Sequence, residues 1–432
     1  MNNYFIQPML GFEQLYTSNQ AVNFYTKMFS HLDLSSINEF PRKSSKLTKG
    51  EGRKTISRHC IYRAFAVMKI QRLREVSQLL DYLENNIAIA MLCGFPGGRI
   101  PGKDVFYEFL RHTPKSELYG VMASNVQVMA ELELVDCKNL IEDSMPIFAN
   151  TKLNNAKSFA KNKFNKGRPP AADSDCKLGV YAASNDSCGK NSEWYWGYKD
   201  HLLLDAKYGL PIFNVTLPAN THDSKAGEKL IIEASSNLPL KGKVKNLICD
   251  KAFDSNPFYE FVMDNLGARV IAPLRSNAKI QLYDGSPPLC DAGLKMHKCG
   301  SINRVSGIRF KFICPFRNSK NKSCPCNHRN FLKPAKNKGC IKYRLVKSAN
   351  LRNCTDRASA SFKLLYSKRT AIERYNSRFK FLDNEKASVR NINSVSSIVS
   401  ISHVCLQLTA IVAAKDSNLL LVRSLASLKR AA

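Results

Sequence analysis

Hydrophobic side chains recur at every third or fourth position through much of the first 130 residues, which is the spacing of amphipathic helices. The longest such run covers residues 60–86, and a second covers 104–112 after a break rich in Gly and Pro at 94–102. Pro101 stands just before the second run, where a proline commonly begins a helix. We therefore predict a helical unit over residues 1–130, and this pattern fits a DNA-binding module and an ordinary helical bundle equally well.

Beyond residue 131 the pattern changes to short apolar runs, which predict strands, separated by helix-like segments. The predicted strands are 136–150, 195–206, 211–217, 244–249 and 269–274, and the predicted helices are 222–235 and 255–267. The order β-β-β-α-β-α-β indicates a mixed α/β unit over residues 131–275. Two of these strands are expected to end at an acidic side chain, because Asp143 follows the apolar residues 137–141 and Asp250 follows 244–249.

Residues 276–362 break this alternation and hold seven of the 14 cysteines, all between Cys290 and Cys354. The N-terminus does not resemble a secretory signal, so a disulfide scaffold is not expected. The only close pair is Cys324-Pro325-Cys326, and no C-x-x-C is present, which favours reduced cysteines over a Zn²⁺ site. We interpret this stretch as a basic, Cys-rich insertion.

The longest stretch without charge lies between Arg390 and Lys415. It is long enough to cross a bilayer, but it contains His403, Gln407 and several Asn and Ser residues. These polar side chains favour a buried core helix over a membrane span.

The composition adds a strong positive charge, since 65 Lys+Arg stand against 35 Asp+Glu, a formal net charge of +30. A hydrophobic content of 44% argues against a disordered polycation. With a membrane disfavoured, the charge indicates nucleic acid as the partner. Residues 276–362 contain 18 Lys/Arg and three acids, and the predicted basic loop 151–170 contains six Lys/Arg and no acid.

The sharpest chemical pattern lies in residues 363–383, which we predict to form one helix. At about 100° per residue, a single stripe about 60° wide contains the four polar residues Tyr366, Arg369, Glu373 and Lys380. The apolar residues occupy a separate face. A solvated helix face with ordinary ion pairs is the simple interpretation.

Two more carboxylates, at the predicted strand ends, favour a functional interpretation. Asp143, Asp250 and Glu373 together could bind two Mg²⁺ ions about 4 Å apart, as in enzymes that displace phosphodiesters in line. Arg369 and Lys380 on the same helix face could then bind neighbouring phosphates.

These residues resemble the DDE-type transposases of bacterial insertion sequences, in the group marked by a YREK signature. That signature is Tyr, two residues, Arg, three residues, Glu, six residues and Lys, and it is complete here from Tyr366 to Lys380. Segments 143–155, 197–224 and 248–255 are also similar to the family. The last of these has Ala252-Phe253 where the family usually has Gly-Tyr, a change that does not affect Asp250.

The resemblance implies an RNase H-like α/β core that uses two Mg²⁺ or Mn²⁺ ions to cleave and transfer DNA strands at element ends. Its metal ligands and catalytic residues would be Asp143, Asp250 and Glu373, and its DNA contacts would be Tyr366, Arg369 and Lys380. It implies a DNA-binding domain over 1–130 and the catalytic Glu helix with C-terminal helices over 363–432.

Other acids compete for these roles, and the residues alone leave them open. Glu142 competes with Asp143, although it would point to the opposite side of a continuing strand. Asp205 suits a turn, Asp223 a helix start and Asp254 a helix cap.

Three functions remain in competition. The first is an active transposase, cytoplasmic and acting on double-stranded DNA as a homo-oligomer. The second is a catalytically inactive transposase-derived DNA-binding protein, and the third is another RNase H-like nuclease. The intact signature favours the first.

Overall fold

The computed structural model describes residues 19–39, 56–151, 170–182, 192–275, 283, 285–304, 307–317, 339–347 and 350–431. Most of the predicted basic loop 151–170 therefore lies outside the described residues, as do Cys324 and Cys326.

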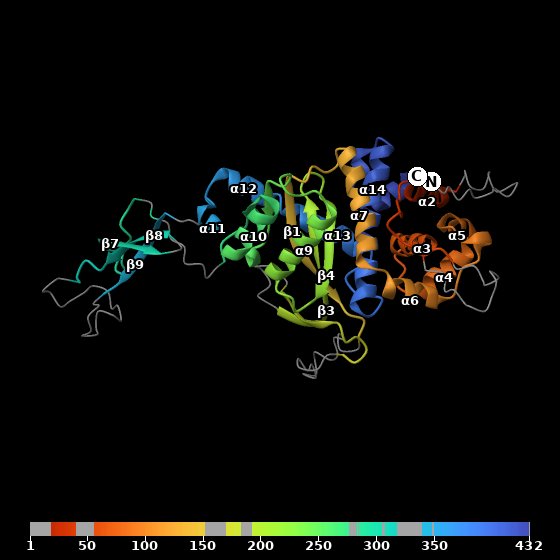
Figure 1. The fold of residues 1–432 in the computed structure, drawn as a ribbon, viewed down its shortest axis with the longest axis horizontal. Coiled ribbons are helices and arrows are strands. Elements are labelled where there is room, and N and C mark those ends of the chain that lie inside the picture. The colour runs from red at the N-terminus through yellow and green to blue at the C-terminus, as the bar shows by residue number, and fades with distance from the viewer. Residues whose placement is uncertain are drawn as a thin grey trace.

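The N-terminal third is helical, as the hydrophobic spacing predicts. Its helices are α2 (Gln20–Ser30), α3 (Arg58–Ile70), α4 (Val76–Asn85), α5 (Ile87–Cys93), α6 (Lys103–His112) and α7 (Lys115–Glu131). Helix α5 ends at Gly94, whose φ of +99° is a conformation that a residue with a Cβ rarely adopts. Figure 1 shows helices α2 to α6 on one side of α7 and α14, with the sheet on the other side.

The central element is a mixed sheet. Its strands are β1 (Asn139–Phe148), β2 (Lys177–Ala182), β3 (Ser192–Asp205), β4 (Leu210–Pro218), β5 (Asn246–Ile248) and β6 (Arg269–Ile271). They lie in the order β2-β3-β1-β5-β6, and β4 also pairs with β3. β1 runs antiparallel to β3 and parallel to β5, which in turn runs parallel to β6. Helices α9 (Asp223–Asn237) and α10 (Asn256–Leu266) connect the later strands.

The two aspartates lie at equivalent positions on neighbouring parallel strands. β1 lies within the predicted strand 136–150, but the expectation that the strand ends at Asp143 is wrong: β1 continues to Phe148 because it stays paired with β3. Its pairing with β5, however, ends at Ile141 opposite Ile248. Asp143 and Asp250 each follow that last pair by two residues, so both emerge where the parallel pairing ends.

The predicted helix 363–383 is in fact two helices, α12 (Ala360–Ser367) and α13 (Thr370–Phe381). Tight turn bonds join them, from the Lys368 amide to the Leu365 carbonyl and from the Arg369 amide to the Tyr366 carbonyl. The break has a packing cause, since α12 contacts β6 while α13 contacts β1 and α14. The prediction that the four signature residues lie on one continuous helix is therefore wrong: Tyr366 lies in α12, and Glu373 and Lys380 lie in α13.

Helix α14 (Ile392–Lys415) is the charge-free segment, and it lies buried in the centre of the protein (Figure 1). By length and apolar composition it could cross a membrane, yet 94% of its most apolar window is buried by other parts of the chain. It packs against α3, α6, α7 and β4, so the N-terminal helices and the sheet share one hydrophobic core. The division into domains at residues 130 and 275 stays a prediction.

A buried polar chain joins α14 to the sheet and to α13. His403 contacts the Asp200 carboxylate of β3 at 2.7 Å, and the Tyr375 hydroxyl of α13 at 2.6 Å. Asp200 also accepts a hydrogen bond from Asn214 at 2.7 Å. These side chains fix α13, and with it the signature residues, against the sheet.

The predicted insertion forms a second, small sheet of β7 (His297–Arg304), β8 (Gly307–Ile313) and β9 (Ile341–Lys347). Its core is separate from the main one and consists of Cys290, Met296, Phe312 and Cys340. Figure 1 shows this sheet standing away from the body, and we call it the arm. In the described part of the chain no cysteine forms a disulfide, and no group of metal-ligating side chains is arranged to bind an ion.

Candidate active site

Three carboxylates from three separate elements meet at one guanidinium group. The Arg369 side chain lies 3.5 Å from Asp143, 3.8 Å from Asp250 and 3.6 Å from Glu373, measured between the nearest nitrogen and oxygen. Asp143 comes from β1, Asp250 follows β5, and Glu373 lies in the first turn of α13. The three residues predicted to act together are therefore close together in the fold.

Local structure explains how each carboxylate is held. Asp143 accepts a hydrogen bond from the Ser144 amide at 3.0 Å. Asp250 caps the 3-10 turn η3 (Lys251–Phe253) by accepting a hydrogen bond from the Ala252 amide at 3.2 Å. The turn therefore forms even though Ala252-Phe253 stand where the family usually has Gly-Tyr. Glu373 is free to move, because 67% of its side chain is exposed. The cluster is thus rigid at the sheet and open to solvent at the helix.

Arg369 is suited to hold this cluster without a metal. Burial works against its charge, but the charges of Asp143, Tyr366, Asp250 and Glu373 outweigh burial and raise the pKa of Arg369. Its Nε atom is buried and has no hydrogen-bond partner among the described residues. The guanidinium therefore makes long ion pairs with all three acids rather than one tight bidentate pair.

Burial raises the pKa of Asp143 to about 6, even though the Arg369 charge and the Ser144 amide act in the opposite direction. A carboxyl whose pKa is raised in the folded state stabilises the fold at low pH, and this contribution is lost as the pH rises through the folded pKa. The metal-free protein should therefore lose stability between about pH 4, near the ordinary pKa of an aspartate, and about pH 6, the pKa of Asp143 in the fold.

Asp143→Asn should remove this part of the pH dependence, because the amide stays neutral. We expect the variant to melt about 2 °C higher at pH 7 in the absence of metal, on the order of 1 kcal/mol. Thermal melts of both proteins across this pH range in a chelator test the expectation. Parallel curves for the two proteins would contradict it.

The structure places the other two signature residues differently. Tyr366 lies near the cluster: burial raises its pKa, and charges of Arg369, Asp250 and Asp143 also act on it. Its ring stacks on Phe362 with centroids 6.0 Å apart. Lys380, at the far end of α13, instead pairs with Glu385 at 3.0 Å, so the structure does not bring it to the carboxylates.

The competing acids have other partners. Glu142 points to the opposite face of the sheet, as predicted, and is fully buried there. It packs so closely on Gly227 of α9 that any larger residue at that position would clash with it. Asp205 accepts bonds from the Cys137 and Lys207 amides, which is the predicted turn role. Asp223 begins α9, as predicted, and pairs with Lys199 at 2.9 Å.

Asp254 does not cap the following helix, and that prediction is wrong. Ser255 is the capping residue of α10, while the Asp254 side chain is fully buried and bound by Arg352 and Arg357. Sequence reasoning missed these arginines, because about a hundred residues separate them from Asp254 and no local pattern connects them.

The donor set at the cluster fits a hard divalent cation, since it consists of carboxylate oxygens alone. Among the described residues, however, no three such side chains are close enough to bind an ion as they stand. The group between them is the Arg369 guanidinium, so a metal could bind only if this side chain moved aside.

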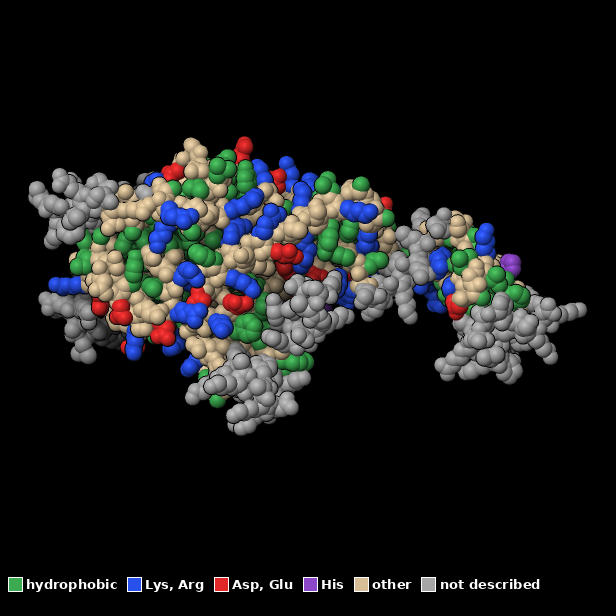
Figure 2. Space-filling model, turned by 180° about the vertical axis from the view of Figure 1, so that it is seen from behind, with side chains coloured by type: hydrophobic (Ala, Val, Ile, Leu, Met, Phe, Trp, Pro, Cys, Tyr) green, Lys and Arg blue, Asp and Glu red, His purple; other side chains and the backbone are tan. Residues whose placement is uncertain are grey.

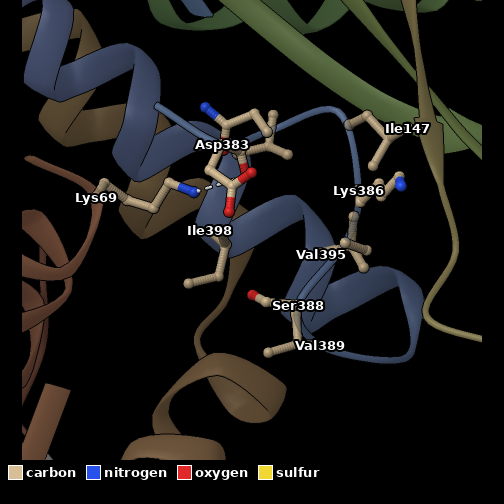
Figure 3. Close-up of a pocket in the computed structure, with 11 residues that line it drawn as sticks. Lys69, Ile147, Asp383, Lys386, Ser388, Val389, Val395 and Ile398 are labelled. Carbon is tan, nitrogen blue, oxygen red and sulfur yellow. Dashed lines mark hydrogen bonds between the residues drawn. The ribbon is translucent and has the colours of Figure 1, made fainter. Parts of the chain in front are cut away.

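One small cavity lies apart from the three carboxylates. The small cavity drawn in Figure 3 is lined by Lys69, Asp383 and Val395 among others, and at about 10 Å³ it holds roughly one water molecule. Lys69 donates to the Asp383 carbonyl at 3.3 Å, and its burial lowers its pKa to about 8. The cavity is a packing feature between α3 and the loop after α13.

Comparison with known proteins identifies the family of the chain. Residues 176–408 match a family model described as the transposase DDE domain, a range that includes Asp250 and Glu373 and begins after Asp143. A cryo-EM structure of the piggyBac transposase synaptic complex with hairpin DNA is 12% identical, with a TM-score of 0.38, over 97% of this chain and 80% of that one. No curated protein sequence matches. Because the family model covers more than half of the chain, the protein belongs to the family with a transposase DDE domain.

Proposed function

We propose that the protein cleaves DNA strands at the terminal inverted repeats of a bacterial insertion sequence and joins them to a target. The observation that carries this proposal is the convergence of Asp143, Asp250 and Glu373 on one cation, Arg369. The strand order and orientations of the sheet support an RNase H-like core, and the complete signature supports the YREK group.

In this proposal Asp143, Asp250 and Glu373 would hold two Mg²⁺ or Mn²⁺ ions. Bound there, the ions would activate a water or 3′-hydroxyl nucleophile and stabilise the leaving oxygen. The residues of the chain orient the substrate: Arg369, once free of the acids, binds a phosphate through two nitrogens, and the Tyr366 hydroxyl donates a hydrogen bond beside it. Lys380 would bind phosphate further along α13 after leaving Glu385.

Charge supports duplex DNA as the substrate. Lys and Arg side chains are spread over the body and are also present on the described part of the arm (Figure 2). The exposed basic residues of the arm include Lys295, Lys298, Arg304 and Arg309. Because three acids close together repel phosphate, DNA can bind over the cluster only when cations neutralise the charge of these acids. We further propose that the protein acts in the cytoplasm as a homo-oligomer on DNA.

Labelled DNA that carries the element's inverted repeats tests the function. We expect cleaved and joined products with Mg²⁺ or Mn²⁺ and none in a chelator. Specific binding without cleavage under any metal condition would instead support the inactive DNA-binding protein. Cleavage without joined products would support another RNase H-like nuclease.

Binding to the same DNA should weaken steeply with salt. Each neutralised phosphate adds about 0.9 to the slope of log affinity against log salt, so a protein of net charge +30 that contacts six or more phosphates should show a slope of about −5 or steeper. Fluorescence anisotropy across a salt series measures this slope. A slope near zero would contradict an electrostatic DNA interface.

A further inference from the structure

Both ends of the insertion converge on one buried carboxylate, that of Asp254. At the first end the Arg275 amide donates to Asp254 at 3.1 Å. At the second end Arg352 binds both carboxylate oxygens, at 2.7 Å and 2.5 Å, and Arg357 binds one of them at 3.2 Å. We call this group of four residues the clamp.

The carboxylate of the clamp is buried, and both of its oxygens are hydrogen-bonded. The Asp254 side chain is fully buried, and those of Arg352 and Arg357 are 15% and 16% exposed. Arg357 also donates to the Ala272 carbonyl and the Tyr259 hydroxyl, both at 2.9 Å. A bidentate pair in such a place fixes direction as well as distance, because the guanidinium and carboxylate planes must align.

The arm packs as a unit of its own. In the described part of the chain the strands β7, β8 and β9 pack chiefly against one another, and the core of the arm is separate from that of the body. Asp254 binds residues from both ends of the insertion, so it brings these two ends to one point of the body.

The clamp also reaches the candidate active site. Arg275 donates to the carbonyls of Lys251 and Ala252, at 3.3 Å and 2.5 Å. These two residues belong to the turn η3, which Asp250 caps. The turn that holds Asp250 is therefore hydrogen-bonded to the Arg275 side chain, at the first end of the insertion.

We propose that Asp254 is a positioning residue that holds the basic arm in one direction relative to Asp143, Asp250 and Glu373, so that one DNA duplex can contact both. This inference rests on the proposed function, because it takes the partner of the arm to be the DNA that the cluster cleaves. Asp254 acts through Arg275, Arg352 and Arg357 and does not itself touch the substrate.

Asp254→Asn tests the proposal, because it keeps the shape of the side chain and removes its charge. The change adds one positive charge to the protein, so a purely electrostatic effect would strengthen DNA binding. The clamp predicts the opposite: affinity for inverted-repeat DNA about tenfold weaker, and a salt slope shallower by about 2, since the arm no longer adds its phosphate contacts.

Asp383→Asn is the matched control. Asp383 pairs with Arg74 at 2.6 Å and 3.0 Å, far from the arm, and its replacement adds the same charge. We expect its DNA affinity and salt slope to equal or slightly exceed those of the wild type. Equal behaviour of Asp254→Asn and Asp383→Asn would overturn the proposal.

The direction of the arm can be measured without DNA. Dyes attached through genetically encoded side chains at the exposed positions Ile308 of β8 and Ile232 of α9 report the distance between arm and body by single-molecule energy transfer. We expect one narrow distribution in the wild type and in Asp383→Asn, and a broad one in Asp254→Asn. A narrow, unchanged distribution in Asp254→Asn would overturn the clamp.

Two further readings separate the possible failures. If Asp254→Asn does not fold, a protein with both Arg352→Gln and Arg357→Gln replaces it, because the two changes together release the second end from Asp254 and should still broaden the distribution. If the wild type binds no DNA, the proposed function fails, while the energy-transfer result still decides whether Asp254 holds the arm.

Discussion

Glu373→Gln is expected to lower strand cleavage by about 10³-fold or more and to leave DNA binding within about twofold. Glu373 supplies one of three carboxylates at the cluster, and the loss of one negative ligand for a catalytic cation removes several kcal/mol of transition-state stabilisation. Folding should not change, because 67% of the side chain is exposed and its one ion pair, to Arg369, is long. Cleavage of labelled element ends under single-turnover conditions measures the effect.

Glu385→Gln is the control for that variant. Glu385 lies shortly after α13, is 47% exposed and pairs with Lys380, so its replacement alters charge in the same region without touching the cluster. We expect cleavage at or slightly above the wild-type rate, because the change frees Lys380 for phosphate and leaves the three carboxylates intact. A Glu373→Gln protein that cuts at the wild-type rate would remove Glu373 from the site.

Arg369→Ala should have the second largest effect. It should lower the stability of the metal-free protein and increase the stabilisation that a bound metal gives. Without metal, the three carboxylates lose their counter-charge. We therefore expect the free energy of unfolding to fall by about 1–2 kcal/mol, a value that allows for the solvent exposure of Asp250 and Glu373. With metal, the cation no longer has to displace a guanidinium. The rise in melting temperature on addition of Mn²⁺ should therefore be larger than in the wild type.

The same variant should cleave DNA about 10²-fold more slowly, because it lacks the bidentate phosphate contact. Arg369→Lys separates the two roles: it keeps a charge near the acids, so its metal-free melting temperature should lie close to the wild type, but cleavage should stay low. An Arg369→Ala protein whose Mn²⁺-dependent stabilisation is no larger than that of the wild type would contradict the displacement of Arg369 by metal.

Much of this site could be predicted from sequence because its residues follow local rules. Asp250 directly follows a short, fully buried strand, and Glu373 lies within a fixed spacing of residue types. Asp143 was predicted as a site residue for a partly mistaken reason. Strand β1 continues past Asp143, and only its pairing with the parallel strand β5 ends there. Local apolar runs show where a strand can form but not how far each neighbour pairs with it.

The errors arise where long-range packing decides. The helix 363–383 looks continuous by periodicity, yet its two halves pack on different elements, and the chain breaks between them at Lys368 and Arg369. β2 escaped prediction because it is short, contains Gly179 and forms only by pairing with β3. The role of Asp254 depends on arginines about a hundred residues away.

The most direct test of the central claim is anomalous diffraction from crystals of the protein grown with Mn²⁺. We expect manganese peaks bounded by Asp143, Asp250 and Glu373, with the Arg369 side chain turned away from them. Ordered density for the cluster with Arg369 still between the three acids, and no manganese beside them at saturating concentration, would contradict the assignment of this site as the catalytic metal centre.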